Sequence, residues 1–129
     1  MTSFKIAAAA MLALCASPAL AQDAALFASS SKLTQTGGEA IYKAICAGCH
    51  MPDGQGAKGA GKYPALAGNE NLESAGYPIY VIIHGQKAMP ALGGVLDDQQ
   101  IADVVGYIRT HFGNNYAEPV TAQEATDSR

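Results

Sequence analysis

Two cysteines three positions apart, followed directly by a histidine, constrain this chain more than any other feature: Cys46, Cys49 and His50. Thiols at this spacing can add to the two vinyl groups of one porphyrin, and the adjacent imidazole can then bind its iron. We therefore expect one covalently attached haem c and a chain that folds around it.

Two other uses of paired cysteines fit the sequence poorly. A thioredoxin-like CxxC motif follows a strand within a βαβ pattern, and no such pattern surrounds Cys46. A structural zinc site needs further cysteine or histidine ligands at short spacing, and the sequence holds no second pair. Covalent haem therefore remains the interpretation of the motif.

Residues 1–21 have the layout of a secretory signal peptide. Lys5 gives the positive start, residues 6–14 form a short apolar run, and Ala21 ends a small-residue cleavage site. The mature chain is thus expected to begin at Gln22. The apolar run is too short and alanine-rich for a good membrane span, and no second run of spanning length follows. We expect a soluble mature protein in the periplasm.

The third cysteine, Cys15, leaves with the signal peptide. A lipoprotein anchored through Cys15 is the alternative, but a small residue normally precedes a lipidated cysteine and this position holds Leu14. Once Cys46 and Cys49 are used by haem, no cysteine remains for a disulfide. The cofactor then replaces it as the covalent staple of a small domain.

The acidic balance of the chain excludes two classes of partner. The sequence has 8 Lys+Arg against 11 Asp+Glu, a formal net charge of −3, and loss of Lys5 with the signal peptide makes it more negative. Nucleic acids and anionic membrane surfaces attract the opposite charge. We expect neither as a partner.

The first half of the mature chain combines polar segments with one helix. Residues 22–35 are small and polar and are expected to form a flexible leader. A helix is predicted to start at Thr36, with Glu39 completing a capping box and apolar residues running into Cys46. Residues 52–62 are rich in glycine and are expected to form a long loop.

The second half contains the clearest helical patterns. A short helix is predicted near Asn69 or Asn71, and another from Pro78 to the residue before Gly85. The last helix is capped by Asp97 or Asp98 and ends at Gly113. Its apolar residues recur at helical spacing: Ile101, Val104, Val105, Ile108 and Phe112. Residues 114–129 are acidic and polar and are expected to be a disordered tail.

These segments together resemble a class I cytochrome c of the small bacterial monohaem kind. The resemblance spans residues 36–113, and four motifs carry it: Gly38-x-x-x-Tyr42-x-x-x-Cys46-x-x-Cys49-His50, Pro64-x-Leu66, Met89-Pro90, and Ile101-x-x-Val104-Val105-x-Tyr107-Ile108. The resemblance implies an all-α fold in which helices wrap one haem. It also implies that the first and last helices cross near Gly38 and Tyr107.

The second iron ligand is expected to be Met89, by elimination together with the family pattern. Met1 and Met11 leave with the signal peptide, and Met51 adjoins His50 and cannot reach the opposite face. A thioether ligand raises the reduction potential of haem iron.

His84 is the rival ligand, and a bis-histidine iron would have a lower potential. Its other interpretation, shared by His111, is a surface imidazole near a helix C-terminus.

The resemblance also gives Pro64 a role, because in the family the carbonyl of the matching proline accepts a hydrogen bond from the ligating histidine. From the sequence alone Pro64 is equally a turn residue. Tyr63, Tyr77 and Tyr80 either bond a haem propionate or pack in the core.

An iron held by histidine and methionine has no open position, so we expect one-electron transfer, without catalytic residues or enzyme activity. The segments 63–68 and 88–91 look like cytochrome modules that serve periplasmic dehydrogenases. The expected function is a monomeric periplasmic carrier, reduced by a dehydrogenase and oxidised by an oxidase or another cytochrome. The alternatives are a cytochrome subunit fixed in a dehydrogenase or oxidase complex, and a haem sensor or enzyme with a labile sixth ligand.

Lysines flank the segments expected to contact haem: Lys43, Lys58, Lys62 and Lys87. They form either a docking ring that steers an acidic redox partner or four ordinary surface residues. A docking ring predicts that electron transfer slows as salt rises.

Overall fold

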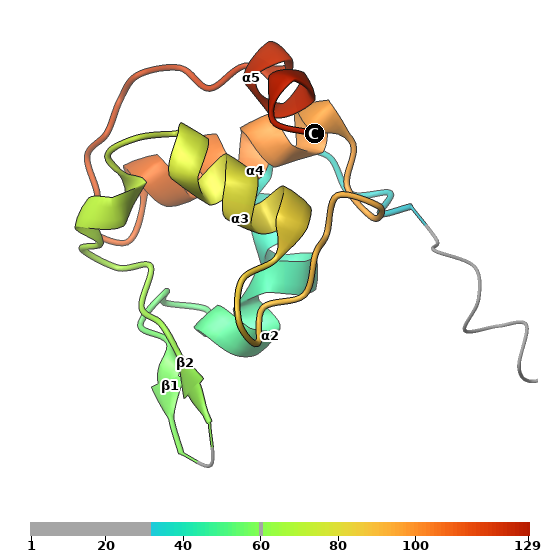
Figure 1. The fold of residues 1–129 in the computed structure, drawn as a ribbon. Coiled ribbons are helices and arrows are strands. Elements are labelled where there is room, and N and C mark those ends of the chain that lie inside the picture. The colour runs from blue at the N-terminus through green and yellow to red at the C-terminus, as the bar shows by residue number, and fades with distance from the viewer. Residues whose placement is uncertain (1–31, 60) are drawn as a thin grey trace, which may run out of the picture.

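The structure, a computed structural model, describes residues 32–59 and 61–129. The predictions for the signal peptide, for Cys15 and for residues 22–31 lie outside this part of the chain. Within it the chain is mostly helical, and a single two-stranded hairpin projects from the helices (Figure 1). The prediction of a helical fold is confirmed, with this hairpin as an addition.

The first helical run consists of α1 (Gly38–Ile41), the π turn η2 (Tyr42–Cys46) and α2 (Ala47–His50). It begins at Gly37, whose φ of 81° is a conformation that glycine adopts without strain. The predicted capping box of Thr36 and Glu39 is wrong. The Glu39 carboxylate instead accepts a 2.6 Å bond from Lys43 one turn along the helix, an ordinary i,i+4 pair.

The first and last long helices cross at Gly38, as the resemblance implied. A Cβ atom on Gly38 would lie 2.2 Å from the Asp103 carbonyl oxygen and 2.4 Å from Cβ of Tyr107. Only glycine permits this approach, because both neighbouring atoms belong to α4 (Asp98–Thr110) and neither is the flexible end of a side chain. The crossing fixes the helix that carries the CxxCH motif against the core.

The predicted loop of residues 52–62 contains two short antiparallel strands, β1 (Ala57–Lys58) and β2 (Lys62–Tyr63). The glycine-rich composition hid them, because each strand has only two residues. The 3₁₀ turn η3 (Glu70–Leu72) follows, where the Asn69 side chain caps the backbone N–H of Asn71. The predicted short helix near Asn69 is confirmed.

The two helices of the second half lie close to their predicted positions. Helix α3 (Gly76–His84) ends at Gly85, whose φ is 75°. Helix α4 starts at Asp97, which forms a capping box with Gln100. It ends at Thr110, before the predicted stop at Gly113, because His111 is already extended.

Residues 114–129 are not a disordered tail, and that prediction is wrong. They cross back over the domain and end in helix α5 (Ala122–Asp127), which packs on α4 (Figure 1). Thr121 and Glu124 form a capping box, and Ala125 is fully buried. Acidic and polar residues suggested disorder, but Ala125 belongs to the core cluster, and Tyr116 and Val120 pack against it.

The end of the predicted leader is also held in place. The Gln100 side chain donates 2.8 Å bonds to the carbonyl oxygens of Leu33 and Gln35, and the Leu33 N–H bonds to Val95. These residues therefore belong to the folded domain. The buried core beneath them joins the first helical run, α3 and α4 through one apolar cluster: Ile41, Tyr42, Leu72, Ile79, Leu96, Ile101, Val104, Val105 and Ile108.

Candidate haem site

A cavity of about 460 Å³ lies between the CxxCH helix, α3, α4 and the loop that joins these last two helices. Its volume is in the range of small-molecule and cofactor sites. Cys46, Cys49, His50, Pro64 and Met89 all line it, so the structure brings every predicted site residue to one place. Apolar residues make up most of the remaining wall: Leu66, Leu72, Pro78, Val81, Ile82, Ala88, Pro90, Val104 and Ile108.

The His50 imidazole is oriented by one backbone bond. Its Nδ1 lies 2.9 Å from the Pro64 carbonyl oxygen. Because a carbonyl only accepts, Nδ1 carries a hydrogen, and in the neutral imidazole the free lone pair is then on Nε2. A neutral imidazole held in this way is the form that binds a metal, and the carbonyl makes it a stronger donor.

A tight turn after His50 brings Pro64 to this position. Met51 has a φ of 65° and ends the helix, and its carbonyl oxygen accepts a 2.6 Å bond from the Tyr42 hydroxyl. The Gly56 N–H then donates to the His50 carbonyl at 2.9 Å. A Cβ on Gly56 would lie 2.2 Å from the Tyr63 carbonyl oxygen and 2.8 Å from that of Pro64. The turn and the proline segment are therefore in direct contact.

Met89 reaches the cavity from the loop 85–97, which we call the methionine loop. Met89 and Gln86 exchange two backbone hydrogen bonds of 2.9 and 3.0 Å, which close a tight turn. Gly85 allows this turn to lie against the end of α3, because a Cβ there would be 2.8 Å from the Met89 carbonyl oxygen. Of the two methionines in the described part of the chain, Met89 lines the cavity and Met51 does not.

His84 and His111 are exposed and lie outside the lining of this cavity. The Nε2 of His84 is 2.7 Å from the carbonyl oxygen of Ser128, and its ring packs on Tyr80. His111 bonds the Tyr107 carbonyl and stacks on the ring of Tyr107. Both positions match surface imidazoles near helix ends.

Two of the three tyrosines that were predicted to bond a propionate or pack in the core lie at the cavity. Tyr63 and Tyr77 line the cavity, and the Tyr77 hydroxyl donates to the Gln86 side chain at 3.1 Å. Tyr80 does not line it. The alternative of core packing is wrong for all of them, since their exposed fractions are 44%, 45% and 56% for Tyr63, Tyr77 and Tyr80.

The Cys46 thiol lies in surroundings that suit uncharged sulfur. Burial, and then the nearby Cys49, raises the pKa of the Cys46 thiol to about 11. A thioether carries no charge, so the apolar wall that disfavours a thiolate does not disfavour a sulfur bonded to porphyrin. Burial also raises the pKa of Tyr42 to about 12, which keeps its hydroxyl protonated as the donor to Met51.

The residues of the cavity fit a haem c. Two thiols and an imidazole lie on one helix, a thioether reaches the same space, and an apolar wall lies between them. Polar side chains that can meet propionate groups also line it: Lys62, Asn69, Asn71 and Lys87. Among the described residues, no group of three or more Cys, His, Asp or Glu could hold a metal ion directly. The donor set therefore suits an iron carried by porphyrin better than a bare ion.

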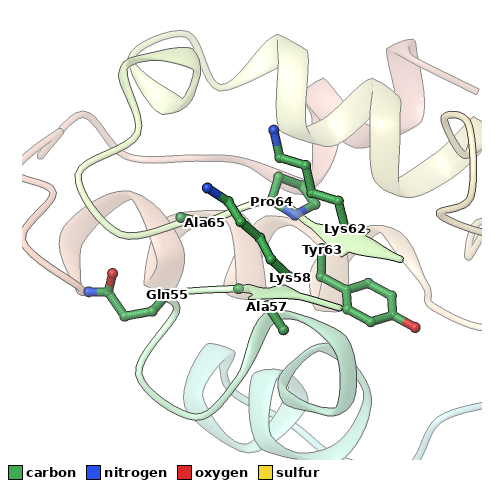
Figure 2. Close-up of a pocket in the computed structure, with 8 residues that line it drawn as sticks. Gln55, Ala57, Lys58, Lys62, Tyr63, Pro64 and Ala65 are labelled. Atoms are coloured by element: carbon green, nitrogen blue, oxygen red, sulfur yellow. The ribbon is translucent and has the colours of Figure 1, made fainter. Parts of the chain in front are cut away.

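A second hollow, of about 570 Å³, lies beside the hairpin and is lined by residues 55–58 and 62–65 (Figure 2). It is open, and its described lining residues contribute no thiol, imidazole or thioether. Lys58 and Lys62 are directly paired across β1 and β2. Figure 2 shows their side chains leaving the hairpin on the same side, away from the Tyr63 ring.

Sequence reasoning missed two side chains that support the site. Asn114 is buried and joins three segments: its amide nitrogen donates to the Leu66 and Ile108 carbonyls, and its oxygen accepts from the Asn69 N–H. Arg109 is 2% exposed and bonds the Leu72 and Glu73 carbonyls. An arginine and an asparagine beside a predicted tail gave no signal of burial.

Comparison with known proteins identifies the family of this chain. The family model described as cytochrome c oxidase, cbb3-type, subunit III matches residues 34–108. Cytochrome c-552 of Thermus thermophilus is 35% identical over 117 residues, covering 75% of this chain and 77% of that protein.

Two further relatives are parts of larger enzymes. The fructose dehydrogenase cytochrome subunit of Gluconobacter japonicus is 39% identical over 105 residues, covering 69% of this chain and 21% of that protein. The cytochrome c subunit of alcohol dehydrogenase (quinone) of Gluconacetobacter polyoxogenes is also 39% identical over 105 residues, covering 71% and 22%. The chain thus spans about a fifth of the length of these subunits.

Proposed function

Because this chain belongs to the cytochrome c family, as a class I monohaem member with one covalent haem c, we propose that it is the electron-accepting cytochrome component of a dehydrogenase complex. The observation that carries the proposal is its similarity to cytochrome subunits of dehydrogenases, combined with a single site that holds both expected iron ligands. The sequence alone favoured a freely diffusing carrier, and these relatives favour its alternative, the fixed subunit.

The chain's own residues have distinct roles in this proposal. When bound, haem c supplies an iron centre that exchanges one electron at a time. Cys46 and Cys49 would hold the porphyrin through thioether bonds, and His50 Nε2 and the Met89 sulfur would bind its iron. Pro64 keeps the imidazole in one tautomer and orientation through its carbonyl.

Electron transfer also requires that these groups move little when the charge changes. The helix crossing at Gly38 fixes the His50 side of the site, and the bonded turn at Gln86 fixes Met89. If His50 and Met89 both bind the iron, no coordination site would be left open for a substrate. We therefore propose electron transfer without substrate turnover at this domain, and a dehydrogenase partner that performs the oxidation.

The hairpin gives the docking surface for that partner. Like charges directly opposite across two strands destabilise the pair, yet Lys58 and Lys62 occupy such positions. The structure records no ion pair for either one within the described residues. Lys62 also lines the haem cavity. An acidic patch on the partner would relieve the repulsion and bring the two redox centres together.

We leave Lys43 out of the proposed surface, because its ammonium is already paired with Glu39 at 2.6 Å. The predicted ring of lysines is thus narrowed to Lys58, Lys62 and Lys87. Lys43→Gln is the matched control for Lys58→Gln and Lys62→Gln. We expect the double hairpin variant to be reduced more slowly by the partner at low salt, with a flatter salt dependence than the control.

The test of the proposed function starts with the holoprotein purified gently from cells that make it. We expect it to remain in fixed ratio with a dehydrogenase, and the substrate of that dehydrogenase to reduce the haem within the isolated complex. A holoprotein that elutes alone, and is reduced only as fast as its collisions with the donor, would instead support a diffusing carrier. The similarity to cytochrome c-552 over most of that protein's length favours this second candidate.

We also propose that the domain works in the periplasm after removal of residues 1–21. None of the helices in the described part of the chain has the length and apolar character needed to cross a membrane. N-terminal sequencing of the purified holoprotein tests the cleavage. The expected first residue is Gln22, and an intact Met1 would contradict export by this signal.

A further inference from the structure

The residues at the end of α5 contact both ends of the methionine loop. Ser128 offers its carbonyl oxygen to His84, the residue directly before the loop, at 2.7 Å. Thr126 donates to Asp98, the residue directly after it, at 2.8 Å. Arg129 also pairs with Asp98. A segment 28 to 44 residues away in the sequence thus bridges the two points where the loop leaves its flanking helices.

Arg129 also bonds the interior of the loop. Its guanidinium donates to the Gly93 carbonyl oxygen at 2.7 Å and to that of Leu96 at 3.1 Å. Gly93 is buried, and its own N–H donates to the carbonyl of Ile83 in α3. It therefore lies between this helix and the Arg129 guanidinium. A single planar group therefore holds two carbonyls and one carboxylate in fixed relative positions.

These contacts also explain why α5 is helical. Six residues are too few for a stable isolated helix. Buried Ala125 and the bonds of Thr126, Ser128 and Arg129 hold it on the domain. Because the same bonds fix the loop, α5 and the methionine loop stabilise each other, and loss of one should loosen the other.

We propose that residues 126–129 form a clamp on the methionine loop, and that Arg129 is the positioning residue that keeps Met89 in place. This inference rests on the proposed role of Met89 as iron ligand. Without the clamp the loop opens more often, and the thioether leaves the iron for longer. The protein then exchanges its sixth ligand more readily, although no residue that lines the haem cavity has changed.

The test is the binding of added imidazole to the oxidised holoprotein, followed by the change in its absorption spectrum. A clamped loop must open before imidazole can enter, so the binding rate reports the opening. We expect Arg129→Ala to bind imidazole at least about tenfold faster. The loss of even one hydrogen bond from a charged donor lowers the free energy of loop opening by enough for a rate change of about this size. Arg129→Lys should bind imidazole at a rate between those of the unaltered protein and Arg129→Ala, because an ammonium cannot form the two parallel bonds of a planar guanidinium.

The matched control is Gln123→Ala in the same helix, whose side chain bonds only Asp127. It should bind imidazole at the rate of the unaltered protein. If Arg129→Ala binds imidazole at the same rate as the control, the clamp is excluded. If imidazole binding accelerates only in proportion to a loss of stability of the whole domain in denaturant, Arg129 has a general structural role and positions nothing in particular.

A third variant separates the two proposals. The far-red band of the oxidised protein marks a methionine–iron bond in this family. If that band is present and survives in Met89→Ala, the ligand proposal fails and the clamp fails with it. If Met89→Ala abolishes the band while Arg129→Ala leaves both band and imidazole rate unchanged, the ligand proposal stands and the clamp alone is wrong.

Discussion

Replacing Gly56 with alanine should damage the haem site from behind the histidine. Gly56 has a φ of 66°, where an alanine costs about 1–2 kcal/mol. Its new Cβ would lie 2.2 Å from the Tyr63 carbonyl oxygen and 2.7 Å from the carbonyl carbon of Pro64, both backbone atoms. Forced overpacking of this kind costs about 1–3 kcal/mol. We therefore expect Gly56→Ala to lower the free energy of unfolding by about 2–5 kcal/mol.

The same substitution should shift the reduction potential. Relief of the contact moves the Pro64 carbonyl away from Nδ1 of His50, where it now lies at 2.9 Å. Without this acceptor the imidazole donates less electron density to the iron. This disfavours the oxidised iron and raises the reduction potential. If the bond favours the oxidised state by about 0.5–1 kcal/mol, the rise is about 20–40 mV.

Denaturant unfolding and redox titration of the holoprotein measure the two effects. Gly106→Ala is the matched control, because a Cβ there meets nothing within 4 Å and the residue lies inside a helix. The control should be neutral or more stable by up to about 1 kcal/mol, with an unchanged potential. A Gly56→Ala protein that matches this control in both measurements would refute the role given to the turn.

Three further predictions concern the scaffold. Gly38→Ala should lower the free energy of unfolding by about 1–3 kcal/mol or more, because α1 and α4 must separate; an unchanged midpoint in denaturant would contradict the close crossing. Arg109→Met should lower it by about 1–3 kcal/mol, because the buried Leu72 carbonyl loses its partner; a loss below about 1 kcal/mol would show that this carbonyl finds another partner. Hydrogen bonding from Thr126 and then Arg129 lowers the pKa of Asp98 below its ordinary 3.8. The ionised carboxylate therefore contributes fully to the free energy of unfolding above pH 3.8, and this contribution is lost as the pH falls through the lowered pKa. Asp98→Asn should flatten the dependence of stability on pH below about pH 3.8, and an unaltered dependence would exclude this linkage.

The haem site was predictable because its chemistry lies in short, fixed spacings. The CxxCH motif places thiols and imidazole on one helix whatever the rest of the fold does. Met89 was predicted because few methionines remain once the expected signal peptide is set aside and because Met-Pro matches the family pattern. The last helix was predicted by the regular spacing of its apolar residues, such as Ile101 and Ile108.

The supporting contacts were not predictable in the same way. Arg129 and Asn114 act through backbone carbonyls that are far away in the sequence, and no periodicity reports such bonds. The composition of residues 114–129 resembles that of disordered segments. One small buried residue, Ala125, and polar bonds to α4 and the methionine loop hold α5 in place, and neither leaves an apolar pattern in the sequence. The two-residue strands at Lys58 and Lys62 are likewise too short to produce an alternating pattern.

The central claim is that His50 and Met89 together hold the iron, and the spectrum and potential of one variant test it most directly. The mature holoprotein and Met89→Ala should be compared in both oxidation states. The account predicts that the far-red band disappears in the variant, that the potential falls markedly, and that the haem remains covalently attached through Cys46 and Cys49. A variant that keeps the band and the potential of the unaltered protein would show that another group is the sixth ligand.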